Sequence, residues 1–351
     1  MTGRTESISF RRWSSAKPPE RILIIRLHAI GDVAITFPAC AAFRSKFPEA
    51  CIDFLTLETT APFAASLEIF NTVHSFPLCR SKWERLRHAI AWAARLQQKR
   101  YQIVLDLQRN WVSRLLRVSA APTAWAEFDR FSPRLAGLRT LDTFHRLVFS
   151  DLDLDFHLPV RTEVLQSARR ILQRRGWHEG KPLVVLNPAG FWATRNWPLE
   201  YYSEFARLWL RDEDAMFLLI GTERISEKSR FLSDGLGSKL INLVGQTSLA
   251  EALGILQHVS FVLSEDSGLM HMAWVSGIPT LALFGSSRHD WSAPIGPHTY
   301  CLHSGDLPCG ACMSATCKYD DVHCLTRHTP HAVYDLARQF IGQHLLRAHH
   351  T

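Results

Sequence analysis

The 351-residue sequence lacks any long hydrophobic run, because no stretch approaches the roughly 18 to 20 apolar residues that a membrane-spanning helix needs. Residues 1–20 also lack the apolar core of a signal peptide. Zinc-finger spacing, helix-turn-helix patterns and RNA-binding aromatic signatures are missing too, and there is no internal repeat or low-complexity tract. These absences predict a soluble cytoplasmic protein and give no support to nucleic-acid binding.

Positive charge is in excess, since 40 Lys and Arg stand against 33 Asp and Glu and give a formal net charge of +7. Such an excess favours an anionic partner, whether nucleic acid, acidic lipid or a phosphorylated substrate. The basic side chains between residues 82 and 117 fall mostly on segments of helical periodicity, where a solvated face is the commoner explanation. Charge alone therefore does not choose the partner.

Short apolar strand patterns alternate with amphipathic helix patterns along the whole chain. This alternation predicts an α/β protein with parallel sheets covered on both faces. A Gly- and Pro-containing linker at residues 176–182 separates two such series and predicts two domains around a cleft. The expected parts are a polar extension (1–20), a first Rossmann-like domain (21–176), a second (182–330) and an amphipathic C-terminal helix (331–351).

Residues 264–285, SEDSGLMHMAWVSGIPTLALFG, read as strand, loop, helix and strand. The pair Asp266-Ser267 would cap the helix, Gly268 would let a ligand approach the backbone, and His271 follows one turn later. A helix N-terminus attracts anions, so this segment predicts a phosphate site. An ordinary capped helix without a ligand explains the same residues.

Three further polar positions follow expected strands. Arg195, after Asn187-Pro188, would make bidentate contacts with phosphate, although the adjoining Trp197 and Pro198 fit a plain helix start. Glu223 would bind ribose hydroxyls or stand as a solvated first-turn acid. Together with residues 266–271 they outline a nucleotide-diphosphate site at one sheet edge.

The first expected strand ends in Gly31-Asp32, without the G-x-G-x-x-G fingerprint, so a nicotinamide site has little support. Asp32 would take a proton from an incoming hydroxyl, or merely cap a helix.

Eight cysteines are present, and four of them lie close together in the sequence: Cys309, Cys312, Cys317 and Cys324. Four thiolates at this spacing would hold one structural zinc ion. The second pair is spaced more widely than in zinc ribbons, and reduced thiols or a disulfide fit equally. The sequence leaves these alternatives open and predicts no catalytic role for the cluster.

Three segments resemble one known family in order and spacing: RLHAIGDVAITFPA, LNPAGFWATRNWP and EDSGLMHMAWVSGIPTLALFG. They are similar to signatures of glycosyltransferase family 9, the ADP-heptose:lipopolysaccharide heptosyltransferases. The resemblance covers residues 21–340 and implies the GT-B architecture, in which two Rossmann-like domains face a cleft. The first domain would bind acceptor and the second would bind the sugar nucleotide.

The resemblance also implies roles for single residues. Asp32 corresponds to the proposed general base, and Arg195 to a basic residue, commonly Lys, that contacts the diphosphate. Four residues correspond to the D-[ST]-G-x-x-H motif that holds nucleotide phosphate and donor sugar: Asp266, Ser267, Gly268 and His271.

Glu223 and Glu227 both lie near the expected ribose-binding acid, and Glu223 is preferred. Arg109 lies in a loop that would face acceptor phosphates or carboxylates. Residues 309–324 resemble a cysteine-rich segment of some members, which favours a structural role for the cluster.

The implied reaction is inverting, metal-independent transfer of heptose from ADP-heptose to the lipopolysaccharide inner core, at the inner face of the cytoplasmic membrane. An anionic glycolipid acceptor would account for the excess of basic residues. The alternatives are a GT-B transferase or epimerase that uses another nucleotide sugar, and a non-catalytic sugar-nucleotide-binding protein.

Overall fold

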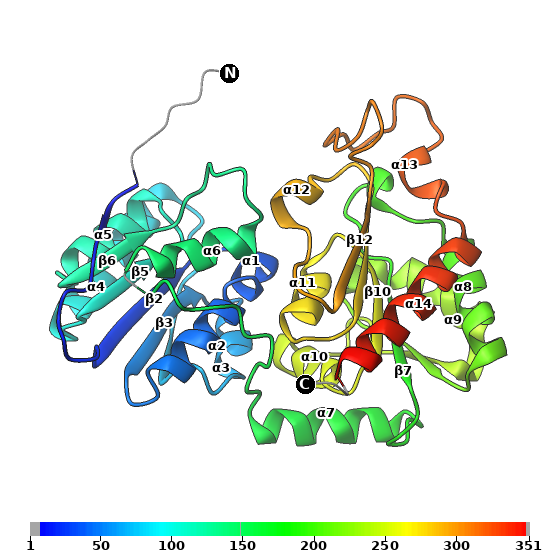
Figure 1. Cartoon of the computed structure of the whole chain (residues 1–351), viewed down its shortest axis with the longest axis horizontal. Helices are drawn as coiled ribbons and strands as arrows, with labels where there is room; N and C mark the ends of the chain where they lie inside the picture. The colour runs from blue at the N-terminus through cyan, green and yellow to red at the C-terminus, as the bar shows by residue number, and fades with distance from the viewer. Residues whose placement is uncertain (1–7, 148, 349–351) are drawn as a thin grey trace. The chain divides into compact units, whose positions relative to one another are not determined.

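The computed structural model describes residues 8–147 and 149–348, and the chain divides into two compact units, Met1–Arg161 and Thr162–Thr351. Within the described residues, each unit holds one six-stranded sheet with helices on both faces (Figure 1). The α/β fold with two parallel sheets, predicted from the alternation of strand and helix patterns, is confirmed.

The first sheet has the strand order β1-β6-β5-β2-β3-β4 and is parallel except for the β1–β6 pair. Its strands are β1 (Phe10–Arg11), β2 (Arg21–Arg26), β3 (Cys51–Leu57), β4 (Thr72–Phe76), β5 (Ile103–Asp106) and β6 (Ala124–Glu127). Its helices are α1 (Ile30–Ala34), α2 (Phe37–Lys46), α3 (Ala61–Ala65), α4 (Lys82–Gln98), α5 (Trp111–Ser119) and α6 (Ala136–His145). The expected polar extension therefore contributes an edge strand, whereas its residues 1–7 lie outside the described part.

Alternate residues of the first sheet bury opposite faces, as a covered parallel sheet requires. Leu23, Ile25 and Leu55 pack with buried side chains of α4 and α5, such as Ala89 and Leu116. The rings of Phe37, Phe54, Phe63 and Phe70 pack together where α2 and α3 cover the other face. Burial of apolar area on both faces stabilises the unit.

The second sheet is parallel throughout and has the order β12-β11-β10-β7-β8-β9. Its strands are β7 (Leu183–Asn187), β8 (Met216–Leu219), β9 (Leu240–Asn242), β10 (Phe261–Glu265), β11 (Thr280–Phe284) and β12 (Thr299–His303). Its α-helices are α7 (Thr162–Arg174), α8 (Leu199–Asp212), α9 (Ser226–Leu236), α10 (Leu249–Leu256), α11 (Gly268–Val275), α12 (His289–Ser292), α13 (His323–Thr326) and α14 (Pro330–Ala348). The short 3-10 turns are η1 (Ala193–Arg195), η2 (Glu223–Ile225) and η3 (Gly237–Lys239).

The C-terminal helix belongs to the core of the second unit. Val333, Ala337 and Phe340 of α14 are buried in one cluster with Phe205 and Trp209 of α8. The predicted amphipathic helix is thus present and packs on α8, whereas residues 349–351 of the expected segment lie outside the described part. None of the helices in the described ranges is long and apolar enough to cross a membrane.

The boundary between the units differs from the linker expected at residues 176–182. Helix α7 precedes that linker but belongs to the second unit, because the division falls after Arg161. It packs closely against α10, where a Cβ at Gly254 would meet the Val164 carbonyl oxygen at 2.8 Å and the Ala168 Cβ at 3.0 Å. The Gly and Pro pattern at 176–182 therefore marks the connection from α7 to β7 within one unit.

Candidate functional site

Polar residues gather where β8, β7 and β10 end, because these neighbouring parallel strands place their carboxyl ends along one edge. We call this the carboxyl edge of the second sheet. Ser267 is the N-cap of α11, and its hydroxyl accepts from the Met270 N–H at 3.3 Å. The Asn187 amide donates to Ser264 Oγ and Ser267 Oγ, both at 2.7 Å. The cap is therefore tied to the end of β7.

His271 lies one turn into α11 and is only 6% exposed. Its Nδ1 accepts a hydrogen bond from the Trp274 indole N–H at 3.0 Å. An imidazole that accepts at Nδ1 carries its proton at Nε2 when it is neutral. His271 is thereby fixed as a hydrogen-bond donor, which suits a phosphate or sugar oxygen.

Arg195 meets the first residue of the predicted motif. Its Nη1 lies 3.4 Å from Asp266 Oδ2, and the guanidinium lies 4.3 Å from the centre of the Trp192 ring. The Arg195 Nε is buried and has no hydrogen-bond partner within the described residues. This cation, Asp266 and the α11 N-terminus thus lie together, as predicted.

A buried carboxylate that the sequence analysis did not single out holds the loop carrying Arg195. The Gly190 and Trp197 N–H groups donate to separate oxygens of Glu265, each at 2.6 Å. Burial raises the pKa of Glu265 to about 7, although Lys228 and the two N–H groups oppose this shift. Any side chain at Gly190 would overlap the Arg195 carbonyl, so the loop folds tightly on itself.

Two basic residues in the segment that follows β8 donate hydrogen bonds to the loop that carries Arg195. Lys228 donates to the Pro188 carbonyl at 2.8 Å and to Asn196 Oδ1 at 2.7 Å. Arg224 donates to the Ala189 carbonyl at 2.9 Å. Both residues follow the predicted Gly221-Thr222-Glu223 segment, but no spacing rule marks them as loop anchors.

Glu223 begins η2 at the end of β8 and is exposed. Its Cγ would lie 2.9 Å from a Cβ at Gly245, so the side chain passes closely over that glycine. Glu227 is exposed on the first turn of α9. Both acids thus stand beside the edge, and the choice of Glu223 stays a prediction.

Asp32 lies at the carboxyl end of β2, inside α1, whose N-cap is Ala29. The alternative interpretation of Asp32 as a helix cap is therefore wrong. Its Oδ1 receives the Arg26 Nη2 at 2.8 Å, and its Oδ2 lies 2.6 Å from His28 Nδ1. A carboxylate, a guanidinium and an imidazole thus form one cluster at the carboxyl edge of the first sheet.

Arg109 does not lie where an acceptor could reach it. Its side chain is 2% exposed, and its Nε lies 3.6 Å from Glu127 Oε2. Arg114 and Arg117 also pair with the buried Glu127 carboxylate, at 3.3 and 2.6 Å. The prediction that Arg109 contacts the acceptor is therefore wrong. Its positive charge instead compensates the buried carboxylate of Glu127, 18 positions further along the chain.

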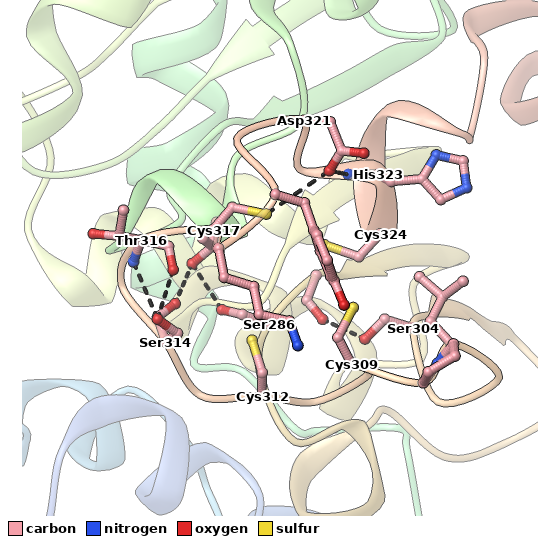
Figure 2. A pocket seen from close by; sticks show the side chains of 16 residues that line it. Ser286, Ser304, Cys309, Cys312, Ser314, Thr316, Cys317, Asp321, His323 and Cys324 are labelled. Carbon is pink, nitrogen blue, oxygen red and sulfur yellow. Dashed lines mark hydrogen bonds between the residues drawn. The ribbon is translucent and has the colours of Figure 1, made fainter.

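The cysteine-rich loop lines a pocket of about 360 Å³ that also includes Thr194, Ser286 and Ser304 (Figure 2). Thr194 Oγ1 donates to the Ser314 carbonyl at 2.5 Å, and the Met313 N–H donates to the Ser286 carbonyl at 2.8 Å. The loop is thus attached beside the residue that precedes Arg195.

All four cysteines of the loop are free thiols: Cys309, Cys312, Cys317 and Cys324. Their sulfurs surround the pocket in Figure 2, but no group of three metal-ligating side chains in the described ranges could hold a metal ion. Burial and the other three cysteines raise the pKa of Cys324 to about 11. The geometry therefore does not support the structural zinc site, and the disulfide alternative is not formed.

The model of glycosyltransferase family 9 (heptosyltransferase) matches residues 89–323. The chain is similar to lipopolysaccharide heptosyltransferase 1 of Pseudomonas aeruginosa, with 26% identity over 85% of this chain and 88% of that protein.

Two solved structures share the fold. One is a family 9 glycosyltransferase from Veillonella parvula, with a TM-score of 0.77 and 17% identity over 92% of this chain and 97% of the other. The second is described as ADP-heptose lps heptosyltransferase II of E. coli, with a TM-score of 0.70 and 19% identity over 92% of this chain and 99% of the other. The architecture is therefore GT-B, and because the family model covers well over half of the sequence, the chain belongs to glycosyltransferase family 9, the heptosyltransferases.

Proposed function

We propose that this glycosyltransferase transfers heptose from ADP-heptose to a sugar hydroxyl of the lipopolysaccharide inner core, with inversion at the anomeric carbon. Membership of the heptosyltransferase family and the names of the similar Pseudomonas and E. coli proteins support this choice of substrates. The observation that carries the proposal is the set of donors at the carboxyl edge of the second sheet. Arg195, the capped start of α11 and the imidazole of His271 together suit a nucleotide diphosphate.

On this proposal, the second unit binds the donor and stabilises its leaving group. Arg195 and the N–H groups at the start of α11, capped by Ser267, balance the negative charge that develops on the diphosphate as the glycosidic bond breaks. His271 donates from Nε2 to a phosphate or sugar oxygen. Asp266 and Gly268 complete the motif beside the donor sugar, and Glu223 binds the ribose hydroxyls.

The first unit supplies the proton acceptor, and Asp32 is the carboxylate on which that step depends. The acceptor oxygen forms the new bond to the anomeric carbon, and the bond to ADP breaks with its electrons remaining on the phosphate oxygen. The hydroxyl proton must leave at the same time, so a base near the end of β2 lowers the barrier.

No divalent metal is needed on this proposal, because a fixed cation and helix N–H groups balance the leaving group. The D-x-D sequences that might suggest a metal site have other partners: Asp151 pairs with Lys46, and Asp214 pairs with Lys181 and Lys239. Enzyme treated with EDTA should keep its rate of transfer. A loss that Mg²⁺ or Mn²⁺ restores would contradict this part of the proposal.

The decisive experiment is mass spectrometry of truncated core glycolipid incubated with the enzyme and ADP-heptose, with UDP- and GDP-sugars in parallel. A mass gain of one heptose only with the ADP sugar is expected. Asp266→Asn should weaken donor binding, whereas Asp214→Asn, which precedes the amino end of β8, is the matched control. Transfer from another nucleotide sugar would favour a different GT-B transferase, and binding without turnover would favour a sugar-nucleotide-binding protein.

An anionic glycolipid acceptor further suggests work at the cytoplasmic face of the inner membrane. Helix α4 exposes Trp83 by 81% and Ile90 by 57%, next to the exposed basic residues Lys82, Arg85 and Arg87. Exposed aromatic and aliphatic side chains among basic ones suit the interface of an anionic bilayer. We therefore assign α4 as the membrane-contacting element of the proposed enzyme.

A further inference from the structure

The imidazole of His28 is bound to the Asp32 carboxylate in one defined way. His28 lies in the loop between β2 and α1, and its Nδ1 is 2.6 Å from Asp32 Oδ2. A carboxylate can only accept, so Nδ1 carries the proton of the neutral ring and Nε2 has the lone pair. The side chain is 48% exposed, and within the described residues the Asp32 contact is its one polar interaction. Nε2 is therefore accessible to a hydroxyl from solution.

The Asp32 carboxylate, in contrast, is held by cations. Arg26 donates from Nη2 to Oδ1 at 2.8 Å and from Nε to the Asp32 carbonyl at 3.3 Å. Arg26 is buried and also donates to the Leu107 carbonyl. The charge of Arg139, on α6, also acts on Asp32, and Arg130 acts on Arg26. These contacts fix the position of the carboxylate beside His28.

We propose that His28 takes the proton from the acceptor hydroxyl, and that Asp32 is the positioning residue that orients and charges the imidazole. The inference rests on the proposed glycosyl transfer and names the base of that reaction. The acceptor oxygen bonds to the anomeric carbon, ADP leaves with the electrons of the broken bond, and the hydroxyl proton moves to Nε2. Asp32 stabilises the resulting imidazolium through the Nδ1–H, until Nε2 releases the proton to solvent.

This arrangement explains why an acid and a histidine lie together at the end of β2. A carboxylate that orients an imidazole and stabilises its charged form is an established solution to proton transfer near neutral pH. The first unit offers a built-in comparison, because His157 Nδ1 lies 3.3 Å from Asp155 Oδ1 on an exposed segment. Among the residues that the structure describes, no guanidinium is paired with Asp155 as Arg26 is with Asp32.

The test uses His28→Asn in the full-length enzyme. The Asn side-chain N–H can replace Nδ1 as donor to Asp32, but the amide cannot accept a proton. Heptose transfer should fall by roughly 100-fold or more in kcat, while ADP affinity measured by calorimetry stays at the wild-type level. His157→Asn should change neither quantity, and thermal melting should show that both variants are folded.

Two further readouts separate a base from a structural contact. The wild-type rate should rise with pH as the base loses its proton, and this rise should vanish in His28→Asn. Added imidazole should restore part of the activity of His28→Ala. A wild-type rate in His28→Asn, or an unchanged pH profile, would overturn the assignment of His28 alone. Absence of transfer by the wild-type enzyme would overturn the proposed function and, with it, the base.

Discussion

The two sheets have the same plan but differ in what they place at their carboxyl edges. Each has six strands in the described part. At the first edge, carboxylates are matched by guanidinium groups: Asp32 by Arg26, and Glu127 by Arg109, Arg114 and Arg117. A third acid at this edge, the buried Asp106 at the end of β5, instead accepts the backbone N–H groups of Gln108 and Arg109. The first edge therefore combines two ion-paired acids with one acid bonded by the backbone.

At the second edge, the buried acid is satisfied mainly by the backbone. Glu265 accepts the N–H groups of Gly190 and Trp197, while Lys228 lies close enough to oppose the rise in the pKa of Glu265. Arg195 is paired with Asp266 beside the start of α11, and on the proposed function Arg195, the start of α11 and His271 would bind the diphosphate. On the proposed function, one topology would support proton transfer in one unit and leaving-group binding in the other, so function would follow the edge residues rather than the fold.

The largest expected effect tests the first edge. Asp32→Asn removes the charge that would stabilise the His28 imidazolium, so kcat should fall roughly 100- to 10,000-fold. ADP affinity should not change, because the variant lies in the other unit. Asp155→Asn, in the exposed His157 pair, is the matched control. ADP release assays that show a near-normal rate for Asp32→Asn would break the proposed division of labour.

A pH titration of stability tests the second edge. The raised pKa of Glu265, about 7, means that the folded state binds this proton more tightly than the unfolded chain, where a value near 4.3 is ordinary. Stability from this proton is present below about pH 4.3 and is lost as the pH rises to about 7. The difference should be roughly 4 kcal/mol and absent in Glu265→Gln. Urea unfolding of both proteins from pH 4 to 8 measures it; parallel curves would contradict the buried, backbone-satisfied carboxylate.

The next largest effect is expected on the affinity for the donor, ADP-heptose. Arg195→Ala removes charge-assisted hydrogen bonds to the diphosphate and should weaken ADP-heptose binding roughly 10- to 100-fold. Arg195→Lys should recover part of the loss, because it keeps the charge but not the bidentate geometry. Calorimetry with Arg211→Ala, an exposed arginine paired with Asp212 on α8, supplies the reference. Equal affinities of Arg195→Ala, Arg195→Lys and Arg211→Ala for ADP-heptose would show that Arg195 does not bind the donor.

The smallest expected effect tests the contrast between the surfaces of the two units. Trp83→Ala should lower binding to vesicles of anionic lipid about fivefold, because less apolar area enters the interface. Binding should weaken as salt rises. Phe231→Ala, which removes an exposed aromatic ring from α9 of the second unit, should leave sedimentation unchanged. The reverse pattern would place the membrane-contacting surface on the other unit.

Most of the fold could be predicted because strand patterns are local. The strand, loop, helix and strand expected over residues 264–285 correspond to the end of β10, to α11 and to β11. Strands β1 and β12 and helix α6 were not predicted, since two polar residues, a partly exposed edge strand and a mixed helix carry little periodicity. The unit boundary was placed too late, because packing of α7 against α10 cannot be inferred from Gly and Pro content.

The site was predictable only where it is contiguous in sequence. Residues 266–271 form one motif, so their assembly at the start of α11 follows from a strand-to-helix turn. The prediction for Arg109 was wrong because its partner, Glu127, lies on another segment of the chain, strand β6. The anchoring of Gly190 by Glu265 and of Asn196 by Lys228 also joins distant segments. Tertiary contacts of this kind leave no spacing signature.

The double hydrogen bond to Glu265 has an entropic consequence for ligand binding. The N–H groups of Gly190 and Trp197 donate to the two oxygens of the Glu265 carboxylate. The segment between them is therefore a short closed loop before any ligand binds. The entropy cost of closing that loop arises during folding, so ligand binding loses little further backbone entropy. More of the interaction energy at Arg195 then appears as affinity.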